Sequence, residues 1–259
     1  MGVLSMPRFD VVLFDLGNTL IYFDGEWPAV SQQGHAVLLE QLSAAGYDLD
    51  GESFTREFQS RIENYYQQRE TEFIEYTTTY FLRTLLGEFG YTSVPDRPLQ
   101  AAVDAMYAIS EAYWKREDDA LATLQTLLRH GYRLGMVSNA GDDSDVQRLV
   151  DQAQLRPYFE VILTSAAQGI RKPNPRIFYN ALEQWRVTPE RAVMVGDTLG
   201  ADILGAENAG LYSIWISRRA DTSANRAHLG TIQPDAVIER LDELPDLLAS
   251  LSETKGPLD

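Results

Sequence analysis

The chain has 259 residues, of which 44% are hydrophobic, and a formal net charge of −16. This composition supports a large buried core and excludes wholesale disorder, and so acidic a surface argues against a nucleic-acid partner. The absence of cysteine excludes disulfides, thiolate nucleophiles and cysteine-based zinc sites. No apolar run approaches the roughly 20 residues that cross a bilayer, and the first ten residues do not resemble a signal peptide. We therefore expect a cytoplasmic protein without a membrane partner.

The first predicted element is a buried strand over residues 9–16, where the sequence is FDVVLFDL. Between about residue 27 and about residue 116 no comparable strand occurs, and helical periodicity dominates. Four helices are expected in this block, over residues 30–45, 54–69, 73–89 and 99–115. Its aromatic residues are interpreted as helical core rather than as a substrate-binding cluster; they include Tyr65, Tyr66, Phe73, Tyr76, Tyr80 and Phe81.

Beyond residue 119 the predicted helices and strands alternate. The helices are expected over residues 120–130, 144–154, 175–185, 200–209 and 241–251. The strands are expected over residues 132–139, 160–165, 192–197, 212–217 and 235–239. Such alternation is typical of an α/β fold with a doubly wound parallel sheet. We predict a core of residues 1–23 and 117–259, and an inserted all-helical cap of residues 24–116.

Carboxylates follow two of the predicted strands, and a third begins the next helix. Asp15 ends the first strand, Asp197 ends the fourth, and Asp202 lies just beyond it. In open parallel sheets ligands bind beyond the carboxyl ends of the strands. Carboxylate oxygens are the ligands that Mg²⁺ prefers. The sequence therefore predicts a magnesium site at this edge of the sheet.

Groups that could hold a phosphate follow the remaining strands. Ser138 and Asn139 end the second strand, and Arg171 and Lys172 lie in a loop after the third. The chain has only three lysines among its 22 basic residues, so a lysine here is notable, and an ammonium supplies a compact charge for phosphate oxygens. Arg171 is expected to be a surface residue or a contact at the rim of the site.

Four segments in this order resemble the motifs of the haloacid dehalogenase (HAD) superfamily of hydrolases. They are FDLGNTL (14–20), VSNA (137–140), GIRKPNPRIF (169–178) and VGDTLGADILGAENAG (195–210). The resemblance implies a HAD-like Rossmannoid core, with the helical insertion as a C1-type cap. It also implies a phosphatase that acts on a small phosphorylated metabolite, as a monomer or homodimer.

The resemblance implies specific roles. Asp15 would attack phosphorus and become an aspartyl-phosphate, which divides a difficult hydrolysis into two steps. Asp15, Asp197 and the main-chain carbonyl of Gly17 would bind Mg²⁺, with Asp202 acting indirectly or through water. The phosphoryl group would be bound by the side chains of Ser138, Asn139 and Lys172. Ser138 and Lys172 would also be catalytic.

Gly17 is a departure from the family pattern. Most phosphatases of the superfamily carry a second aspartate there, which protonates the leaving oxygen, and general acid–base help is typically worth about 10²–10⁴ in rate. Either the substrate has a good leaving group, or the enzyme is slow, or another acid substitutes. The candidates for that acid are Tyr22, Asp24, Glu72 and Glu75.

Two other functions remain open. The same fold supports dehalogenases, which usually have an aromatic residue at the position of Gly17 and need no metal, and phosphonatases, which need a lysine from the cap that forms a Schiff base. Lys115 is the only lysine in that region, and its position matches poorly. The second alternative is a binding or regulatory module without activity, against which the complete set of motif residues argues.

Overall fold

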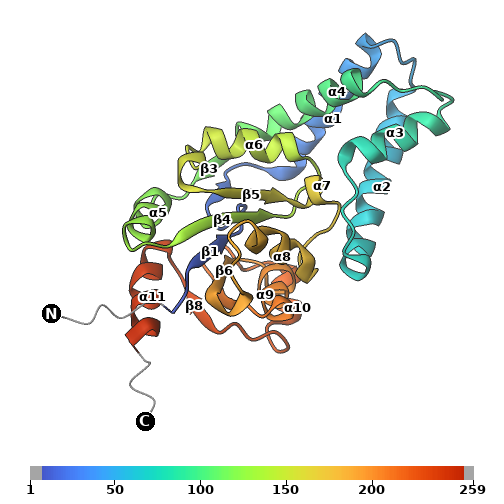
Figure 1. Ribbon diagram of the computed structural model, residues 1–259. Coiled ribbons are helices and arrows are strands. Elements are labelled where there is room, and N and C mark those ends of the chain that lie inside the picture. The colour runs from blue at the N-terminus through green and yellow to red at the C-terminus, as the bar shows by residue number, and fades with distance from the viewer. Residues whose placement is uncertain (1–7, 254–259) are drawn as a thin grey trace.

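The computed structural model describes residues 8–253, apart from the side chains of residues 67–72 and of Glu253. The core contains a six-stranded sheet in the order β5-β4-β1-β6-β7-β8, and each neighbouring pair is parallel (Figure 1). Its strands are β1 (Val11–Phe14), β4 (Arg133–Ser138), β5 (Val161–Thr164), β6 (Ala192–Gly196), β7 (Tyr212–Ile216) and β8 (Ala236–Ile238).

Helices cover both faces of this sheet, which explains why its central strands are continuously apolar. Side chains of a strand alternate between faces. Accordingly Val12 and Phe14 of β1 belong to one core cluster, and Val11 and Leu13 belong to the other. The first cluster includes residues of α5 (Ala120–Arg129), α6 (Asp143–Gln152) and α11 (Leu244–Glu253). The second includes residues of α8 (Pro175–Glu183) and α9 (Leu204–Ala209). The predicted doubly wound parallel sheet is confirmed.

Short elements complete the core. The helix expected over residues 200–209 is divided, because a π-helical turn over Leu199–Ile203 precedes α9. The remaining short helices are α7 (Ser165–Gln168), α10 (Ser223–His228) and three 3₁₀ turns, Arg156–Tyr158, Pro189–Arg191 and Leu241–Glu243. Among residues 8–253, none of the helices combines the length and the apolar character needed to cross a bilayer.

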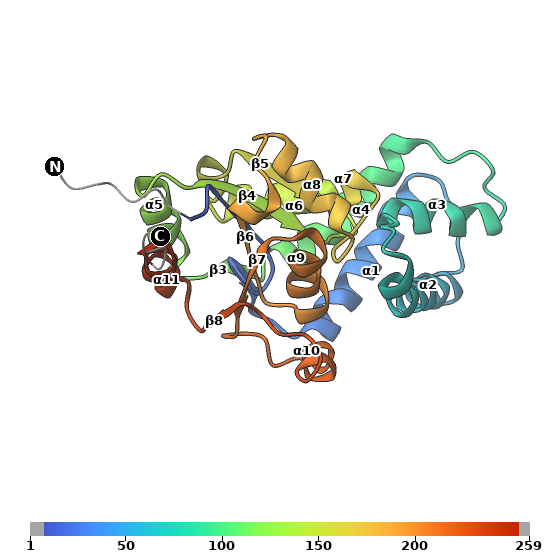
Figure 2. The same cartoon turned by 60° about the horizontal axis from the view of Figure 1, so that its bottom comes forward.

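Four helices form a separate body beside the core (Figure 2). They are α1 (Trp27–Ala44), α2 (Gly51–Glu72), α3 (Thr78–Glu88) and α4 (Asp96–Glu111). These helices have their own apolar cluster, in which Leu38 and Leu42 of α1 pack with Leu82 and Leu99. A body with its own core fits an inserted cap, and we keep residues 24–116 as its proposed bounds.

A two-stranded antiparallel ribbon joins the two bodies. It pairs β2 (Ile21–Phe23) with β3 (Trp114–Arg116), so the chain leaves and re-enters the core through neighbouring strands. The helix predicted up to residue 115 ends at Glu111 for this reason. Three residues per strand are too few to give a period-two pattern, and the partners lie far apart in sequence. The sequence analysis therefore missed the ribbon.

The prediction of a helix from residue 73 was also wrong at its start. Residues 73–77, here called the docking segment, are not helical, and Phe73 has a left-handed φ of 54°. The backbone of this segment bonds to the core: Arg171 N donates to Phe73 O at 3.1 Å, and Glu75 N donates to Gly169 O at 3.2 Å. Bonds to a distant loop replace the helical ones, and α3 begins only at Thr78.

Candidate active site

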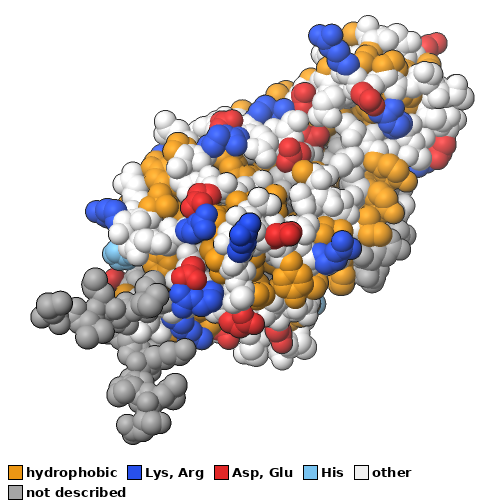
Figure 3. Space-filling view, viewed as in Figure 1, with side chains coloured by type: hydrophobic (Ala, Val, Ile, Leu, Met, Phe, Trp, Pro, Cys, Tyr) orange, Lys and Arg blue, Asp and Glu red, His pale blue; other side chains and the backbone are white. Residues whose placement is uncertain are grey.

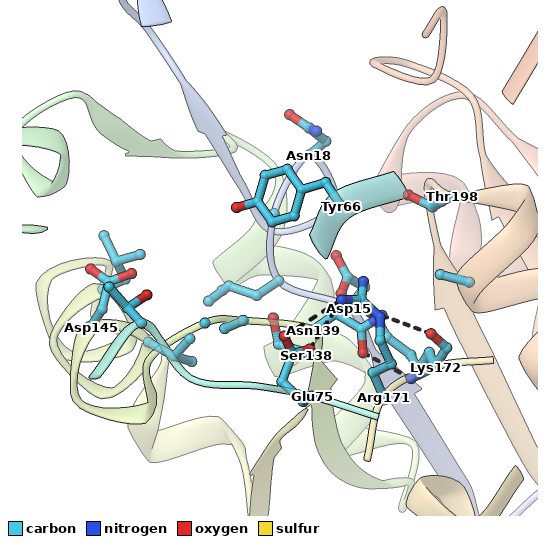
Figure 4. A pocket seen from close by; sticks show the side chains of 18 of the residues that line it. Asp15, Asn18, Tyr66, Glu75, Ser138, Asn139, Asp145, Arg171, Lys172 and Thr198 are labelled. Carbon is cyan, nitrogen blue, oxygen red and sulfur yellow. Dashed lines mark hydrogen bonds and ion pairs between the residues drawn. The ribbon is translucent and has the colours of Figure 1, made fainter. Parts of the chain in front are cut away.

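The carboxyl ends of the three central strands bring the predicted side chains together (Figure 4). Asp15 directly follows β1, which lies between β4 and β6, and its amide donates to Val195 O at 2.9 Å. Ser138 is the last residue of β4, and Asp197 directly follows β6. These residues line a cavity of about 370 Å³.

Lys172 is the electrostatic centre of the site. Its ammonium donates to Asp15 Oδ1 at 2.6 Å, to Asp202 Oδ1 at 2.6 Å and to Val137 O at 2.7 Å. These bonds occupy its three donors, and its side chain is only 1% exposed. Burial alone would lower the pKa of Lys172, but the carboxylates of Asp15 and Asp202 raise it overall. The lysine is therefore a fixed cation beside the predicted nucleophile.

Three carboxylates lie close enough to share a cation. Asp15, Asp197 and Asp202 each offer an oxygen, and these oxygens lie within 4.8 Å of one another. Burial raises the pKa of Asp15 to about 6, against the lowering effect of Lys172. Burial, with Asp202 and Asp15 nearby, also raises the pKa of Asp197. Buried oxygen donors with excess negative charge fit a hard divalent cation such as Mg²⁺.

The bonds of Asp202 suggest that it acts on such a cation indirectly. Lys172 occupies its Oδ1, and the amide of Thr198 donates to its Oδ2 at 2.9 Å. Asp15 and Asp197 keep oxygens available for direct binding. Gly17 also lines the cavity, and binding of the metal by its main-chain carbonyl stays a prediction.

Gly196 is required by the close approach of Asp202. A Cβ at this position would lie 2.3 Å from Asp202 Cγ, far inside van der Waals contact. We expect Gly196→Ala to lower the unfolding free energy by about 2 kcal/mol or more and to weaken Mg²⁺ binding, because Asp202 must move. Chemical denaturation and calorimetric Mg²⁺ titration measure both effects; unchanged Mg²⁺ affinity would contradict this account.

The loop after β6 is held by two residues that the sequence analysis missed. The carbonyl of Asp197 accepts hydrogen bonds from Trp215 Nε1 and Asn225 Nδ2, both at 2.8 Å. Asn225 Oδ1 also accepts from Leu199 N at 2.8 Å. Asn225 is buried in α10, in a region without helical or strand periodicity, so no sequence signal marked it.

Ser138 and Asn139 have different surroundings. Ser138 is buried and lines the cavity. The side chain of Asn139 instead donates to Lys172 O at 3.0 Å and accepts from Lys172 N at 2.9 Å. Asn139 thus fixes the backbone that carries the lysine. It also lines the cavity, and its role in binding the phosphoryl group stays a prediction.

The cap supplies an aromatic wall to the cavity. The interpretation of its aromatic residues as core was wrong for several of them, because they line the cavity. Tyr80 is half exposed, and Phe73 does not line the cavity. The aromatic residues that do line it are Tyr65, Tyr66, Tyr76, Phe81, Tyr107 and Trp114.

Arg171 is not the surface or rim residue that the sequence suggested. It is only 7% exposed, and its Nη1 lies 3.2 Å from Glu75 Oε2. Glu75 also accepts from Tyr65 Oη at 2.6 Å and from Ser165 Oγ at 2.7 Å. The docking segment brings Glu75 to the core loop, which is a long-range effect that local sequence does not reveal.

Two of the other acids considered as substitutes for the missing aspartate lie outside the cavity. Asp24 pairs with Lys115, and Tyr22 lies under the guanidinium of Arg219, 3.7 Å from its ring centroid. Neither residue lines the cavity. The side chain of Glu72 falls outside the described part of the chain.

Three carboxylates and a buried lysine meet at the carboxyl edge of a doubly wound sheet, an arrangement suited to binding a divalent cation and a phosphate. A family model described as haloacid dehalogenase-like hydrolase matches residues 9–210. The chain belongs to this family, and the prediction of a hydrolase of the HAD superfamily is confirmed.

Curated relatives match over nearly the whole chain. A glyceraldehyde 3-phosphate phosphatase from Pyrococcus furiosus is 27% identical over 251 residues, covering 97% of this chain and 96% of the relative. A ribulose-1,5-bisphosphate 5-phosphatase from Halopiger xanaduensis is 34% identical over 250 residues, covering 92% and 98%.

Two solved structures are also similar. A HAD phosphatase from Thermococcus onnurineus has a TM-score of 0.64 and 25% identity, covering 93% of this chain and 98% of that one. A 2-haloacid dehalogenase from Pseudomonas syringae has a TM-score of 0.63 and 26% identity, covering 94% and 99%. The fold is thus similar to those of proteins with two different chemistries.

Proposed function

We propose that this hydrolase is a Mg²⁺-dependent phosphatase that acts on a small phosphorylated metabolite through covalent catalysis by Asp15. The observation that carries the proposal is the ammonium of Lys172, which bridges Asp15 and Asp202 at 2.6 Å each. A carboxylate nucleophile and a phosphate are both anions, so their approach requires fixed positive charge. The curated relatives described above are named as phosphatases, which supports this chemistry.

The residues divide the proposed reaction between them. A carboxylate oxygen of Asp15 forms a bond to phosphorus as the bond to the leaving oxygen breaks, and water then hydrolyses the aspartyl-phosphate to inorganic phosphate. Ser138 would donate a hydrogen bond to a phosphoryl oxygen. Lys172 would give up one of its three present hydrogen bonds and donate to a phosphoryl oxygen instead. Asp15, Asp197 and the Gly17 carbonyl would hold Mg²⁺, which supplies charge neutralisation when bound.

A direct assay tests this function. Purified protein with 4-nitrophenyl phosphate and Mg²⁺ should release inorganic phosphate, and excess EDTA should abolish the release, with recovery on adding Mg²⁺. Phosphate release that is insensitive to the chelator would contradict a metal-dependent reaction. Failure to hydrolyse any member of a broad phosphate-ester panel would leave the non-catalytic alternative.

Gly17 gives a sharper prediction about leaving groups. A Cβ at this position would lie 3.6 Å from Trp114, which is ordinary contact, so an L residue fits. We expect Gly17→Asp to leave kcat on 4-nitrophenyl phosphate nearly unchanged and to raise kcat on an alkyl phosphate such as glycerol 2-phosphate by about 10-fold or more, because an acid is restored. A clear loss on both substrates would show that the glycine is needed for space.

Dehalogenation is the second candidate, because one similar structure is a 2-haloacid dehalogenase. Halide release from a 2-haloacid that persists in EDTA would favour it. The phosphonatase alternative lacks its amine: Lys115 pairs with Asp24 and does not line the cavity. Its hydrogen bond to Asp24 raises the pKa of Lys115, which is the opposite of what an amine nucleophile needs.

A further inference from the structure

The charges around the cavity are unbalanced beyond what the proposed reaction needs. The basic side chains in its wall are Arg171 and Lys172. The acidic side chains in its wall are Asp15, Glu75, Asp145, Asp197 and Asp202. Any substrate must bring the two negative charges of its phosphate into this environment. The rest of the substrate then meets the charges of the wall that the phosphate and the metal do not balance.

Both cations are already committed. All three donors of Lys172 are occupied, and its position beside Asp15 dedicates it to the transferred phosphate. The guanidinium of Arg171 is compensated by Glu75, with which it forms an ion pair while both side chains are buried. A bound Mg²⁺ would be balanced by the carboxylates of Asp15 and Asp197. Among the described residues of the wall, no basic side chain remains for a second anionic group.

Asp145 lies among other carboxylates on the far side of the cavity. In Figure 4, Lys172, Arg171 and Asp15 lie together on one side of the cavity and Asp145 lies on the other. Its Oδ1 is buried and has no hydrogen-bond partner within the described part of the chain. Burial and the neighbouring carboxylates of Glu111 and Asp142 raise the pKa of Asp145 to about 8. Surroundings that oppose a charge on Asp145 also oppose a negative charge on a ligand placed there.

Aromatic rings also line the cavity. Tyr66, Tyr76, Phe81 and Trp114 belong to the wall, and Figure 4 shows Tyr66 above the gap between Asp15 and Asp145. Aromatic rings contact apolar or hydroxylated groups favourably and present a negative face that disfavours anions. The outer surface offers no contrasting basic patch in the view of Figure 3, where acidic and basic side chains are interspersed.

We infer that the substrates of this enzyme carry a single phosphate on an otherwise uncharged, small alcohol or phenol, and that Asp145 and the compensated Arg171–Glu75 pair exclude a second anionic group. This inference rests on the proposed phosphatase function. It is not inherited from the relatives, because the one from Halopiger xanaduensis is named for a bisphosphate. The restriction comes from the charges of this cavity.

A matched pair of substrates tests the inference. In 4-(carbamoylmethyl)phenyl phosphate and 4-(carboxymethyl)phenyl phosphate, shape and leaving group are nearly the same, because a methylene separates the ring from the amide or carboxylate. At near-physiological salt, which screens the net charge of the whole protein, we expect the amide to have a kcat/KM about 10-fold or more higher than the acid. Equal values would overturn the inference.

Two variants test whether Asp145 causes the preference for the amide over the acid. Measured at pH 9, above the pKa of about 8 at which Asp145 takes up its charge, Asp145→Asn should reduce the preference for the amide by about 3-fold or more relative to the wild type at the same pH, by improving kcat/KM for the acid. Asp151→Asn is the matched control, since Asp151 lies on the same helix, is paired with Arg156 and does not line the cavity; it should keep the wild-type preference. An unchanged preference in Asp145→Asn, or an equal change in the control, would contradict the role of Asp145.

The outcomes for the inference and for the proposed function differ. Hydrolysis of both aryl phosphates at similar rates leaves a phosphatase without the restriction. If neither aryl phosphate is hydrolysed and 4-nitrophenyl phosphate is not hydrolysed either, the proposed function is wrong and the inference falls with it. Because the comparison uses the wild-type protein, a folding defect in a variant cannot decide the result.

Discussion

Asp15→Asn is expected to lower kcat on every phosphate ester by about 10⁵-fold or more. An amide cannot act as the nucleophile, and Asp202 cannot take over, because it is held by Lys172 and Thr198 N. The fold should persist, since the amide oxygen of asparagine can still accept the bond from Lys172. Steady-state phosphate release, with circular dichroism as a check on folding, measures this effect.

Asp10→Asn is a suitable control for that variant. Asp10 immediately precedes β1, the strand that Asp15 follows, and it pairs with Arg191 on a partly exposed surface. Exposed ion pairs contribute little to stability, so this change should leave kcat within about twofold of the wild type. Turnover in Asp15→Asn that stays above a hundredth of the wild-type rate would contradict nucleophilic catalysis by Asp15.

Lys172→Met is expected to damage both activity and stability. Without the ammonium, Asp15 and Asp202 face each other as uncompensated buried carboxylates. We expect the unfolding free energy at pH 7.5 without Mg²⁺ to fall by about 3–5 kcal/mol, and kcat to fall by about 10³-fold. Urea unfolding and phosphate release measure these two losses.

The stability loss in Lys172→Met should depend on pH and on metal. The pKa of Asp15, already raised to about 6 by burial, rises further without the lysine. The folded state then binds more protons than the unfolded state, so the variant gains stability relative to wild type as the pH falls from 7.5 toward 5. Mg²⁺ should restore part of the loss at pH 7.5.

Lys115→Met provides the comparison for Lys172→Met. Lys115 is another of the three lysines in the sequence and forms an exposed pair with Asp24. Because an exposed ion pair contributes little to stability, its replacement should leave both the unfolding free energy and kcat close to the wild-type values. If both variants lost stability equally, the loss could not be assigned to the buried cluster.

The parallel sheet and the positions of its carboxyl ends could be predicted from sequence, because both depend on local patterns. A continuously apolar segment ending at Asp15 and another ending at Asp197 indicate buried parallel strands. Parallel strands align their carboxyl ends, so the side chains that follow them must meet. Lys172 was found through its motif and the scarcity of lysine.

The parts that could not be predicted depend on contacts between distant segments. The sequence pattern predicts a helix through the docking segment, but its hydrogen bonds to the loop containing Gly169 and Arg171 hold it in a non-helical conformation. The burial of Arg171 follows from its pairing with Glu75, 96 positions away. The sequence pattern predicts only that Asp145 lies in a helix, and its place in the cavity wall depends on the packing of the cap helix α4 against α6.

The central claim is that a phosphoryl group is transferred to Asp15. Acid quenching of the wild-type enzyme during turnover of 4-nitrophenyl phosphate, followed by proteolysis and mass spectrometry, locates any covalent intermediate. The account predicts one phosphoryl group on the peptide that contains Asp15, with none in the Asp15→Asn variant. A phosphoryl group on another residue would contradict it, as would turnover in which the Asp15 peptide is never modified under conditions that preserve acyl phosphates.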